Sequence, residues 1–166
     1  MMDLETFNKM EDKALIKALS DLLEHCEWVL PKLIAQRPYH SISAIEQELS
    51  TLIASSSKDI QLHILQSHPK LGLKKFEPGF SQSEQQQAGL NLLSEEEFEK
   101  LNILNHQYEN KHGFPFIIAV TGLTKDQIFQ AFKDRIKFES GDELTTAIKE
   151  VTTIAKIRLG KLISES

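Results

Sequence analysis

The sequence predicts an all-α fold, a single-domain helical bundle of about eight helices with one short extended buried segment. Through most of the chain, apolar residues recur at spacings of three and four, which is the period of an α-helix. Serine and threonine residues stand before several of these segments as helix-start signals. One apolar segment, Phe114–Val120, could pass for a buried strand, but the sequence offers it no convincing partner strand. We therefore expect this segment to be extended and buried without belonging to a sheet.

Eight segments combine helical spacing with a start or stop signal, and in order these are residues 14–23, 28–34, 43–55, 57–67, 81–92, 94–111, 124–138 and 141–162. Pro31 falls in the first turn of its segment, where proline is tolerated. Pro69 ends the fourth helix near Ser67, because proline keeps the residue before it out of the helical region. Gly113 is expected to stop the sixth helix, and the glycines and proline of Lys70–Phe80 predict a loop.

Helix starts are a more specific prediction than helix lengths. The residues expected at N-caps are Ser43, Ser57, Ser81, Ser94 and Thr124. Ser43 and Ser81 are each followed three residues later by glutamate, which is the pattern of a capping box. In such a box the two side chains satisfy backbone amides that a helix start leaves unpaired.

Composition and charge exclude several classes of partner. The length of 166 residues suits one domain, residues 1–166, with a sizeable core. The net charge of −5 is spread along the chain, so we expect no nucleic-acid partner. We also expect no membrane partner, because no apolar stretch could cross a bilayer and no secretory signal is visible. The lone Cys26 cannot form an intrachain disulfide, which fits a cytoplasmic location.

His68 stands at the end of a predicted helix, directly before Pro69. Its imidazole can exchange a proton near neutral pH, as a general acid–base must, and the following loop would leave it open to a cleft. The alternative is a polar helix end, at which the helix dipole favours the imidazole. The residues alone leave both interpretations open.

Ser81, Glu84 and Gln85 open the fifth predicted helix and also allow two interpretations. As a capping box, Ser81 and Glu84 would be occupied by backbone amides. As a ligand site, a glutamate one turn into a helix would lie beside unsatisfied amide groups, a polar setting that could orient a urea-like ligand. The small residues Ala88 and Gly89 would allow another backbone or a ligand to approach closely.

Arg158 lies between Ala155 and Leu159, on the face of the last helix that the spacing predicts to be apolar. Because a buried unpaired guanidinium is very costly, Arg158 must meet an acid, carbonyl oxygens or an anionic ligand. The alternatives are an internal ion pair, with Glu84 or another carboxylate, and an exposed edge of the helix.

The histidines do not indicate a metal site. His63 and His68 are five residues apart, and His106 and His112 are six apart. Neither pair has the i, i+4 spacing that places two imidazoles on one helix face. We therefore expect no bound metal.

Three unlike elements follow one another along the chain, and they are His68–Gly72, Ser81–Gln85 and Gly113–Val120. In this order and spacing they resemble the family of 2-oxo-4-hydroxy-4-carboxy-5-ureidoimidazoline (OHCU) decarboxylases, which complete the conversion of urate to allantoin. The resemblance extends to Arg37–Tyr39 and to Ala155–Leu159, so it covers nearly the whole chain.

The resemblance implies an all-α homodimer that acts on a small ureide, with His68 and Glu84 as the catalytic residues. The residues implied to bind the substrate are Pro69, Ser81, Glu84, Gln85, Phe116, Ile117, Ile118, Ala119 and Arg158. One departure is visible, because His112 stands before Gly-Phe-Pro-Phe where the family typically has phenylalanine.

The implied substrate explains why no cofactor is expected. Its carboxylate sits on a carbon next to a carbon–nitrogen double bond, which can take up the electrons when CO2 leaves. Many decarboxylases need a bound cofactor as this electron sink. The protein would have to orient the ring, place charge and transfer one proton to one face, giving (S)-allantoin.

Two other classes of function are compatible with an all-α chain of this size. One is a non-catalytic module that binds partner helices in a groove. The other is a hydrolase that acts on a related ureide. Neither accounts for the three elements occurring together.

Overall fold

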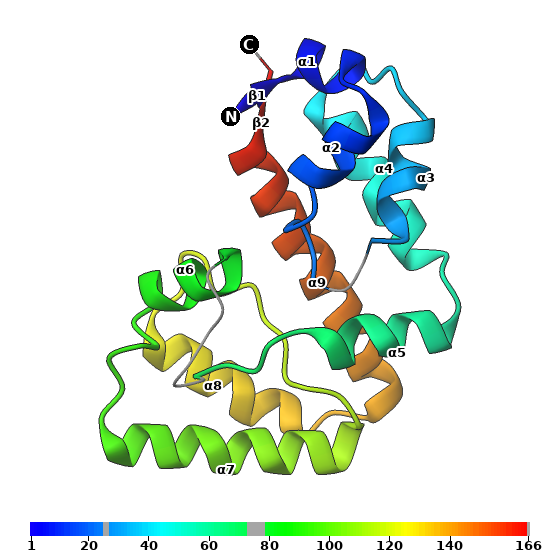
Figure 1. Ribbon diagram of the computed structural model, residues 1–166. Helices are drawn as coiled ribbons and strands as arrows, with labels where there is room; N and C mark the ends of the chain where they lie inside the picture. Colours follow the sequence, from blue (N-terminus) through cyan, green and yellow to red (C-terminus); the bar gives the residue numbers. More distant parts are fainter. Residues whose placement is uncertain (25–26, 73–78, 166) are drawn as a thin grey trace. The chain divides into compact units, whose positions relative to one another are not determined.

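The computed structural model describes residues 1–24, 27–72 and 79–165. Within these residues the chain forms nine helices, and they are α1 (Leu4–Lys9), α2 (Asp12–Ala18), α3 (Val29–Ala35), α4 (Ile42–Ala54), α5 (Lys58–Ser67), α6 (Phe80–Gln87), α7 (Glu95–His112), α8 (Lys125–Ile136) and α9 (Ser140–Leu162) (Figure 1). The all-α prediction is confirmed. Cys26 and most of the loop expected over Lys70–Phe80 lie outside the described residues.

Two short elements were not predicted. Helix α1 precedes the first expected helix, and two strands of two residues each, β1 (Met2–Asp3) and β2 (Ile163–Ser164), pair in parallel. Met2 lies opposite Ile163, so the two ends of the chain run side by side (Figure 1). None of the described helices is both long and apolar enough to span a membrane.

The chain divides into two compact units. The first unit comprises Met1–Ile64 together with the chain from Thr152 onward, and the second comprises Leu65–Val151. Helices α5 and α9 each continue from one unit into the other. The expectation of a single domain over residues 1–166 stays a prediction.

The core of the first unit is built from aliphatic side chains at helical spacing, with Leu33 on α3 and Leu49 on α4 both fully buried. The turn after α3 contacts the end of α1. Arg37 donates from Nη1 to the carbonyl oxygens of Phe7 at 2.9 Å and of Met10 at 2.8 Å, which lie at the end of α1. A cation is favoured at a helix C-terminus, so this contact both satisfies carbonyls and complements the helix dipole.

Four of the helix signals are confirmed. The Ser57 hydroxyl accepts from the Ile60 amide at 3.2 Å. Ser94 with Glu97, and Thr124 with Gln127, form reciprocal capping boxes. Gly113 ends α7 in the left-handed region, with φ +81°. These signals are local, so the sequence pattern was sufficient to place them.

Two expected N-caps are wrong. Helix α4 begins at Ile42 and is capped by Ser41, whose extended backbone lets its hydroxyl accept from the Ala44 amide at 3.0 Å. Ser43 is therefore already inside the first turn. Helix α6 begins at Phe80 after Gly79, which makes no side-chain cap, so Ser81 is also inside its helix.

Helix α6 also ends earlier than predicted, at Gln87 rather than near residue 92. The Leu90 amide donates to the Gln85 carbonyl at 2.9 Å and the Gly89 amide to the Gln86 carbonyl at 3.0 Å, which is a Schellman motif. Gly89 has φ +81°, and nothing lies within 4 Å of where its Cβ would be. The glycine therefore provides the left-handed turn, and no other part of the described chain approaches it closely. The close approach of a ligand stays a prediction.

Tyr108 is the centre of the second unit's core. Its ring is fully buried and lies 5.9 Å from the Phe114 ring, 5.3 Å from Phe116 and 6.0 Å from Phe132. Phe114–Val120, the segment expected to be extended, forms no helix and pairs with no strand among the described residues, and it is largely buried. We call it the extended segment. Aromatic edge-to-face packing thus holds a segment that has no sheet around it.

His112 belongs to the same aromatic cluster. Its ring is 4.5 Å from that of Tyr108 and stacks on Phe114 at 6.1 Å, while Nδ1 lies 2.8 Å from the Ser140 hydroxyl. Burial lowers the pKa of His112, an effect that the nearby charge of Lys111 reinforces and that of Glu143 opposes. The imidazole therefore occupies an aromatic position in its neutral form.

We predict that His112→Phe flattens the acid limb of the stability profile. Because the folded-state pKa lies below the ordinary value of 6.5, the unfolded chain takes up this proton first as the pH falls. Stability present above about pH 6.5 is then lost in acid. Urea unfolding at about pH 7 and pH 5 should show a smaller loss for the variant than for the wild type.

The exposed His106 on the same helix provides the control. His106→Phe should keep the wild-type difference between the two pH values. An equal loss in wild type and His112→Phe would contradict the assignment.

Candidate active site

His68 is the first residue after α5, as Pro69 predicts, and it is half-buried. Its amide donates to the Leu65 carbonyl at 3.2 Å, the last backbone bond of the helix. Pro69 is also half-buried, and the chain then turns inward so that Leu71 and Gly72 are buried. The histidine thus stands where a helix gives way to a buried loop.

Residues 69–72, which we call the His68 loop, are held by the side-chain amides of two residues. Gln85 on α6 accepts from the Gly72 amide at 2.9 Å through Oε1 and donates from Nε2 to the Lys70 carbonyl at 3.2 Å. Asn105 on α7 donates to the Leu71 carbonyl at 3.2 Å. We call these three contacts the carboxamide clamp. Sequence analysis did not find it, because a glutamine on a helix gives no local sign of its distant backbone partner.

Gly72 is fixed by shape as well. Its φ is +73°, and an added Cβ would lie 2.1 Å from Cδ2 of Leu101. A side chain at this position would be strained and would also collide with the core. The carboxamide clamp therefore binds the backbone at a position, Gly72, that suits only glycine.

Ser81, Glu84 and Gln85 on α6 are buried or half-buried, and their role in substrate binding stays a prediction. Glu84 and Gln85 are each 6% exposed, and Ser81 is half-buried. Because α6 begins at Phe80 and its N-cap, Gly79, makes no side-chain hydrogen bond, the capping-box interpretation of Ser81 and Glu84 is wrong. Gln85 has part of its hydrogen-bonding capacity left over, since a carboxamide offers four bonds and the clamp uses two.

The side chains of the extended segment are partly or fully buried. Phe116 and Ile117 are buried, whereas Ile118 and Ala119 are half-buried. Arg135 on α8 donates from Nη1 to the Ile117 carbonyl at 2.6 Å. Arg135 is paired in turn with Glu143 on α9. The His68 loop, helix α6 and this segment with its buried ion pair all belong to the second unit.

Arg135 could have been found from the sequence. It follows Ile128 by seven residues and Phe132 by three, so it lies on the apolar face of its helix. The same reasoning placed Arg158 on the apolar face of its helix, although an exposed helix edge was left open. Burial raises the pKa of Tyr108, and its hydrogen bond to Glu143 adds to the effect, so the phenol stays a donor at neutral pH.

A half-buried carboxyl, Glu150, lies near the end of the segment. Burial raises its pKa, and the charge of Arg135 and the Ala119 amide act in the opposite direction. Sequence analysis missed this residue too.

Arg158 belongs to the first unit. It is fully buried, and Nη1 donates to the Leu22 carbonyl at 3.1 Å and to Glu24 at 3.3 Å. The interpretation of Arg158 as part of an exposed helix edge is therefore wrong. The carboxylate that Arg158 pairs with is that of Glu24. The role of Arg158 in substrate binding stays a prediction.

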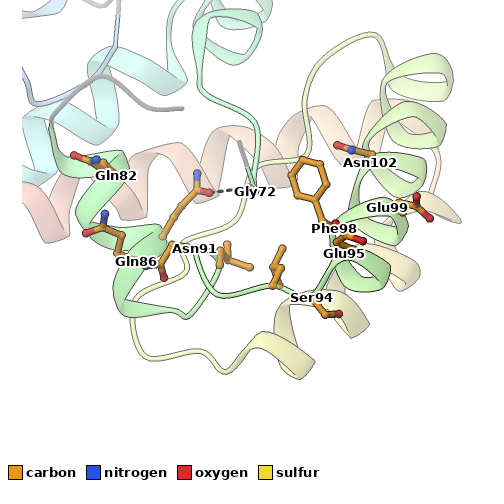
Figure 2. Close-up of a pocket in the computed structure, with 12 residues that line it drawn as sticks. Gly72, Gln82, Gln86, Asn91, Ser94, Glu95, Phe98, Glu99 and Asn102 are labelled. Carbon is orange, nitrogen blue, oxygen red and sulfur yellow. Dashed lines mark hydrogen bonds between the residues drawn. The ribbon is translucent and has the colours of Figure 1, made fainter. Parts of the chain in front are cut away.

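A cavity of about 680 Å³ lies between α6 and α7. Figure 2 shows the carboxamides of Gln82 and Gln86 on one side and Phe98, Glu99 and Asn102 of α7 on the other. Of the predicted site residues, Gln85 alone lines this cavity, and its bond to Gly72 is the dashed line in Figure 2. His68 and Glu84 are not among the residues that line it.

No group of three or more histidine, cysteine, aspartate or glutamate side chains that could hold a metal is found in residues 1–24, 27–72 and 79–165. The expectation of a metal-free, cofactor-free protein stays a prediction.

Comparison with known proteins decides the family. The family model described as OHCU decarboxylase matches residues 8–160. The chain belongs to the OHCU decarboxylase family. The OHCU decarboxylase of Halalkalicoccus jeotgali is 34% identical over 161 residues, which are 97% of this chain and 92% of the relative. That of Xenopus laevis is 35% identical over 162 residues, which are 95% of this chain and 93% of the relative.

Some of the proteins that the chain matches are longer than it is. A uric acid degradation bifunctional protein of Bacillus subtilis is 35% identical over 99% of this chain, and the chain spans 33% of its length. Among solved structures, an (S)-allantoin synthase superposes with a TM-score of 0.81 at 26% identity, covering 99% of this chain and 54% of that one. An OHCU decarboxylase crystallised in the presence of (S)-allantoin superposes with a TM-score of 0.72 at 24% identity, covering 92% and 97%. At that identity the second likeness supports the fold alone.

We predict that Gln85→Met destabilises the second unit. Methionine fills a similar volume but leaves the Gly72 amide and the Lys70 carbonyl without their partner. An unsatisfied buried group costs about 1–3 kcal/mol, so the free energy of unfolding in urea should fall by that order.

Gln86→Met serves as the control, because Gln86 is exposed and next along the same helix. It should change stability little. If both variants lose the same small amount, the clamp does not hold the loop.

Proposed function

We propose that the chain catalyses the cofactor-free decarboxylation of OHCU to (S)-allantoin and CO2 in urate catabolism, as a carboxy-lyase. Membership of the family over residues 8–160 supports the reaction. The structural observation that supports it is the carboxamide clamp. Through Gln85, the clamp ties the chain two and four residues after His68 to α6, one residue from Glu84.

In the proposed reaction the bond to the carboxylate carbon breaks and its electron pair flows into the neighbouring carbon–nitrogen double bond. The substrate hydroxyl loses its proton and becomes a carbonyl. A proton then arrives at the carbon that carries the ureido arm, creating the stereocentre. The ring nitrogen that receives the electron pair takes up one proton from the solvent, which balances the reaction. The protein therefore has only to orient the substrate and move protons.

His68 is the proposed acid–base, taking the hydroxyl proton, delivering the new carbon-bound proton, or both. Glu84 and Gln85, with Ser81, are proposed to grip the ureido arm, and Pro69 to shape the pocket wall. A buried carboxylate makes a strong acceptor for urea N–H groups, because hydrogen bonds to charged groups are stronger than neutral ones.

The remaining contacts in the proposal are to the ring. Backbone groups of Phe116–Ala119 are proposed to hold it, and Arg158 to bind charged or carbonyl groups of the substrate. The homodimer that the family resemblance implied and the cytoplasmic location that the lone Cys26 fits also stay predictions. Light scattering of the purified protein tests the homodimer, and cell fractionation tests the cytoplasmic location.

The function is tested by giving the protein freshly generated OHCU, made from urate with urate oxidase and hydroxyisourate hydrolase, in excess chelator. OHCU should disappear faster than without protein, followed in the ultraviolet, and circular dichroism should show one hand of allantoin. Chelation should leave the rate unchanged, since no metal is used. A racemic product formed at the uncatalysed rate by folded protein would refute the proposal.

We further predict that His68→Asn removes most turnover while ligand binding remains. Asparagine keeps a polar helix end but has no proton to exchange near neutral pH. A positioned general acid–base contributes about 10²–10⁴-fold, so turnover should fall by that order. Steady-state decarboxylation measures turnover, and calorimetry with allantoin measures binding. Near-normal turnover would remove His68 from the mechanism and assign the proton to Glu84.

A further inference from the structure

The second unit contains a buried ion pair that the proposed chemistry does not use. Arg135 on α8 is 7% exposed and Glu143 on α9 is fully buried. Arg135 donates from Nε to Oε1 of Glu143 at 3.0 Å and from Nη2 to Oε2 at 2.9 Å. The Tyr108 hydroxyl of α7 also donates to this carboxylate. One carboxylate thus joins three helices.

The pair does not use the whole guanidinium. Its remaining nitrogen, Nη1, donates to the Ile117 carbonyl at 2.6 Å, and the guanidinium carbon lies 4.5 Å from the centre of the Phe116 ring. Arg135 is therefore the link between the ion pair and the extended segment. A planar guanidinium suits this task, because its donors point in fixed directions.

The hydrogen bond from Arg135 to the Ile117 carbonyl also orients the next backbone N–H, that of Ile118. The peptide between Ile117 and Ile118 is trans, so the Ile118 N–H is antiparallel to the Ile117 carbonyl. Holding the carbonyl toward Arg135 aims the Ile118 N–H away from the ion pair. Within the described residues this amide has no hydrogen-bond partner. A fixed backbone donor without a partner is suited to an oxygen of a ligand.

We infer that Arg135 is a positioning residue, which by holding the Ile117 carbonyl aims the Ile118 amide at a carbonyl oxygen of the substrate ring. This inference rests on the proposed function, since it concerns the same segment. Glu143 holds the guanidinium in place, and Tyr108 supports Glu143 without bonding to the segment's backbone.

Tyr108 therefore supplies a matched control. Tyr108→Phe keeps the ring that packs on Phe116 and removes the hydroxyl from Glu143, leaving the bond from Arg135 to Ile117 in place. Arg135→Lys keeps the positive charge, but a single ammonium cannot face the carboxylate and the Ile117 carbonyl with the geometry of the guanidinium.

A second test variant guards against a failure to fold. Arg135→Met combined with Glu143→Leu removes both charges together, and buried ion pairs are often replaced by apolar residues of similar volume without loss of the fold. Like Arg135→Lys, this double variant lacks the contact that positions Ile117.

The experiment compares kcat and KM for OHCU, and allantoin affinity by calorimetry, in the wild type, both test variants and Tyr108→Phe. We expect KM to rise and allantoin affinity to fall about tenfold in the test variants, the equivalent of one lost hydrogen bond. Tyr108→Phe should keep the wild-type KM. A purely structural defect would instead reduce the active fraction, lowering apparent kcat with KM unchanged.

The outcomes separate two failures. If the wild type does not convert OHCU, the proposed function fails and the inference fails with it. If the wild type is active and a folded test variant keeps its KM and allantoin affinity, the inference alone is overturned. It is also overturned if Tyr108→Phe raises KM as much as the test variants do.

Discussion

The fully buried carboxylate of Glu143 is the constraint on which the second unit depends. A charge in this position is tolerated only when it is paired and hydrogen-bonded, and Arg135 and Tyr108 meet that condition from two other helices. The same arginine then satisfies a carbonyl of a segment that has no strand partner among the described residues. The extended segment can therefore be buried, because an ion pair does part of what a sheet would otherwise do for its backbone.

The His68 loop is held by a different kind of contact. Gln85 and Asn105 bind its backbone through neutral amide groups. Such contacts fix the loop without placing a further charge beside the candidate acid–base. The same loop also carries an ion pair, between Lys70 and Glu109 on α7 at 2.9 Å.

The sequence was informative where the physics is local. The capping boxes of Ser94 and Thr124, the stop at Gly113 and the effect of Pro69 each depend on residues within one helical turn. The same Ser-x-x-Glu pattern failed at Ser43 and Ser81, because the position of the extended residue before each helix decides the cap. The contact of Tyr108 with Glu143 joins residues 35 apart, and β1 with β2 joins the two chain ends, so neither has a local signal.

The pairing of β1 with β2 makes the backbone almost a closed ring. Because the strands are parallel, a linker from the end of β2 has to run back to the start of β1, which takes a crossover of roughly a dozen flexible residues. The chain could then be opened at an exposed turn elsewhere. In such a circular permutant, α9 would be followed by β2, the linker, β1 and α1. Covalent closure would also restrict the unfolded ensemble, because joining the ends removes conformations that only the open chain can reach.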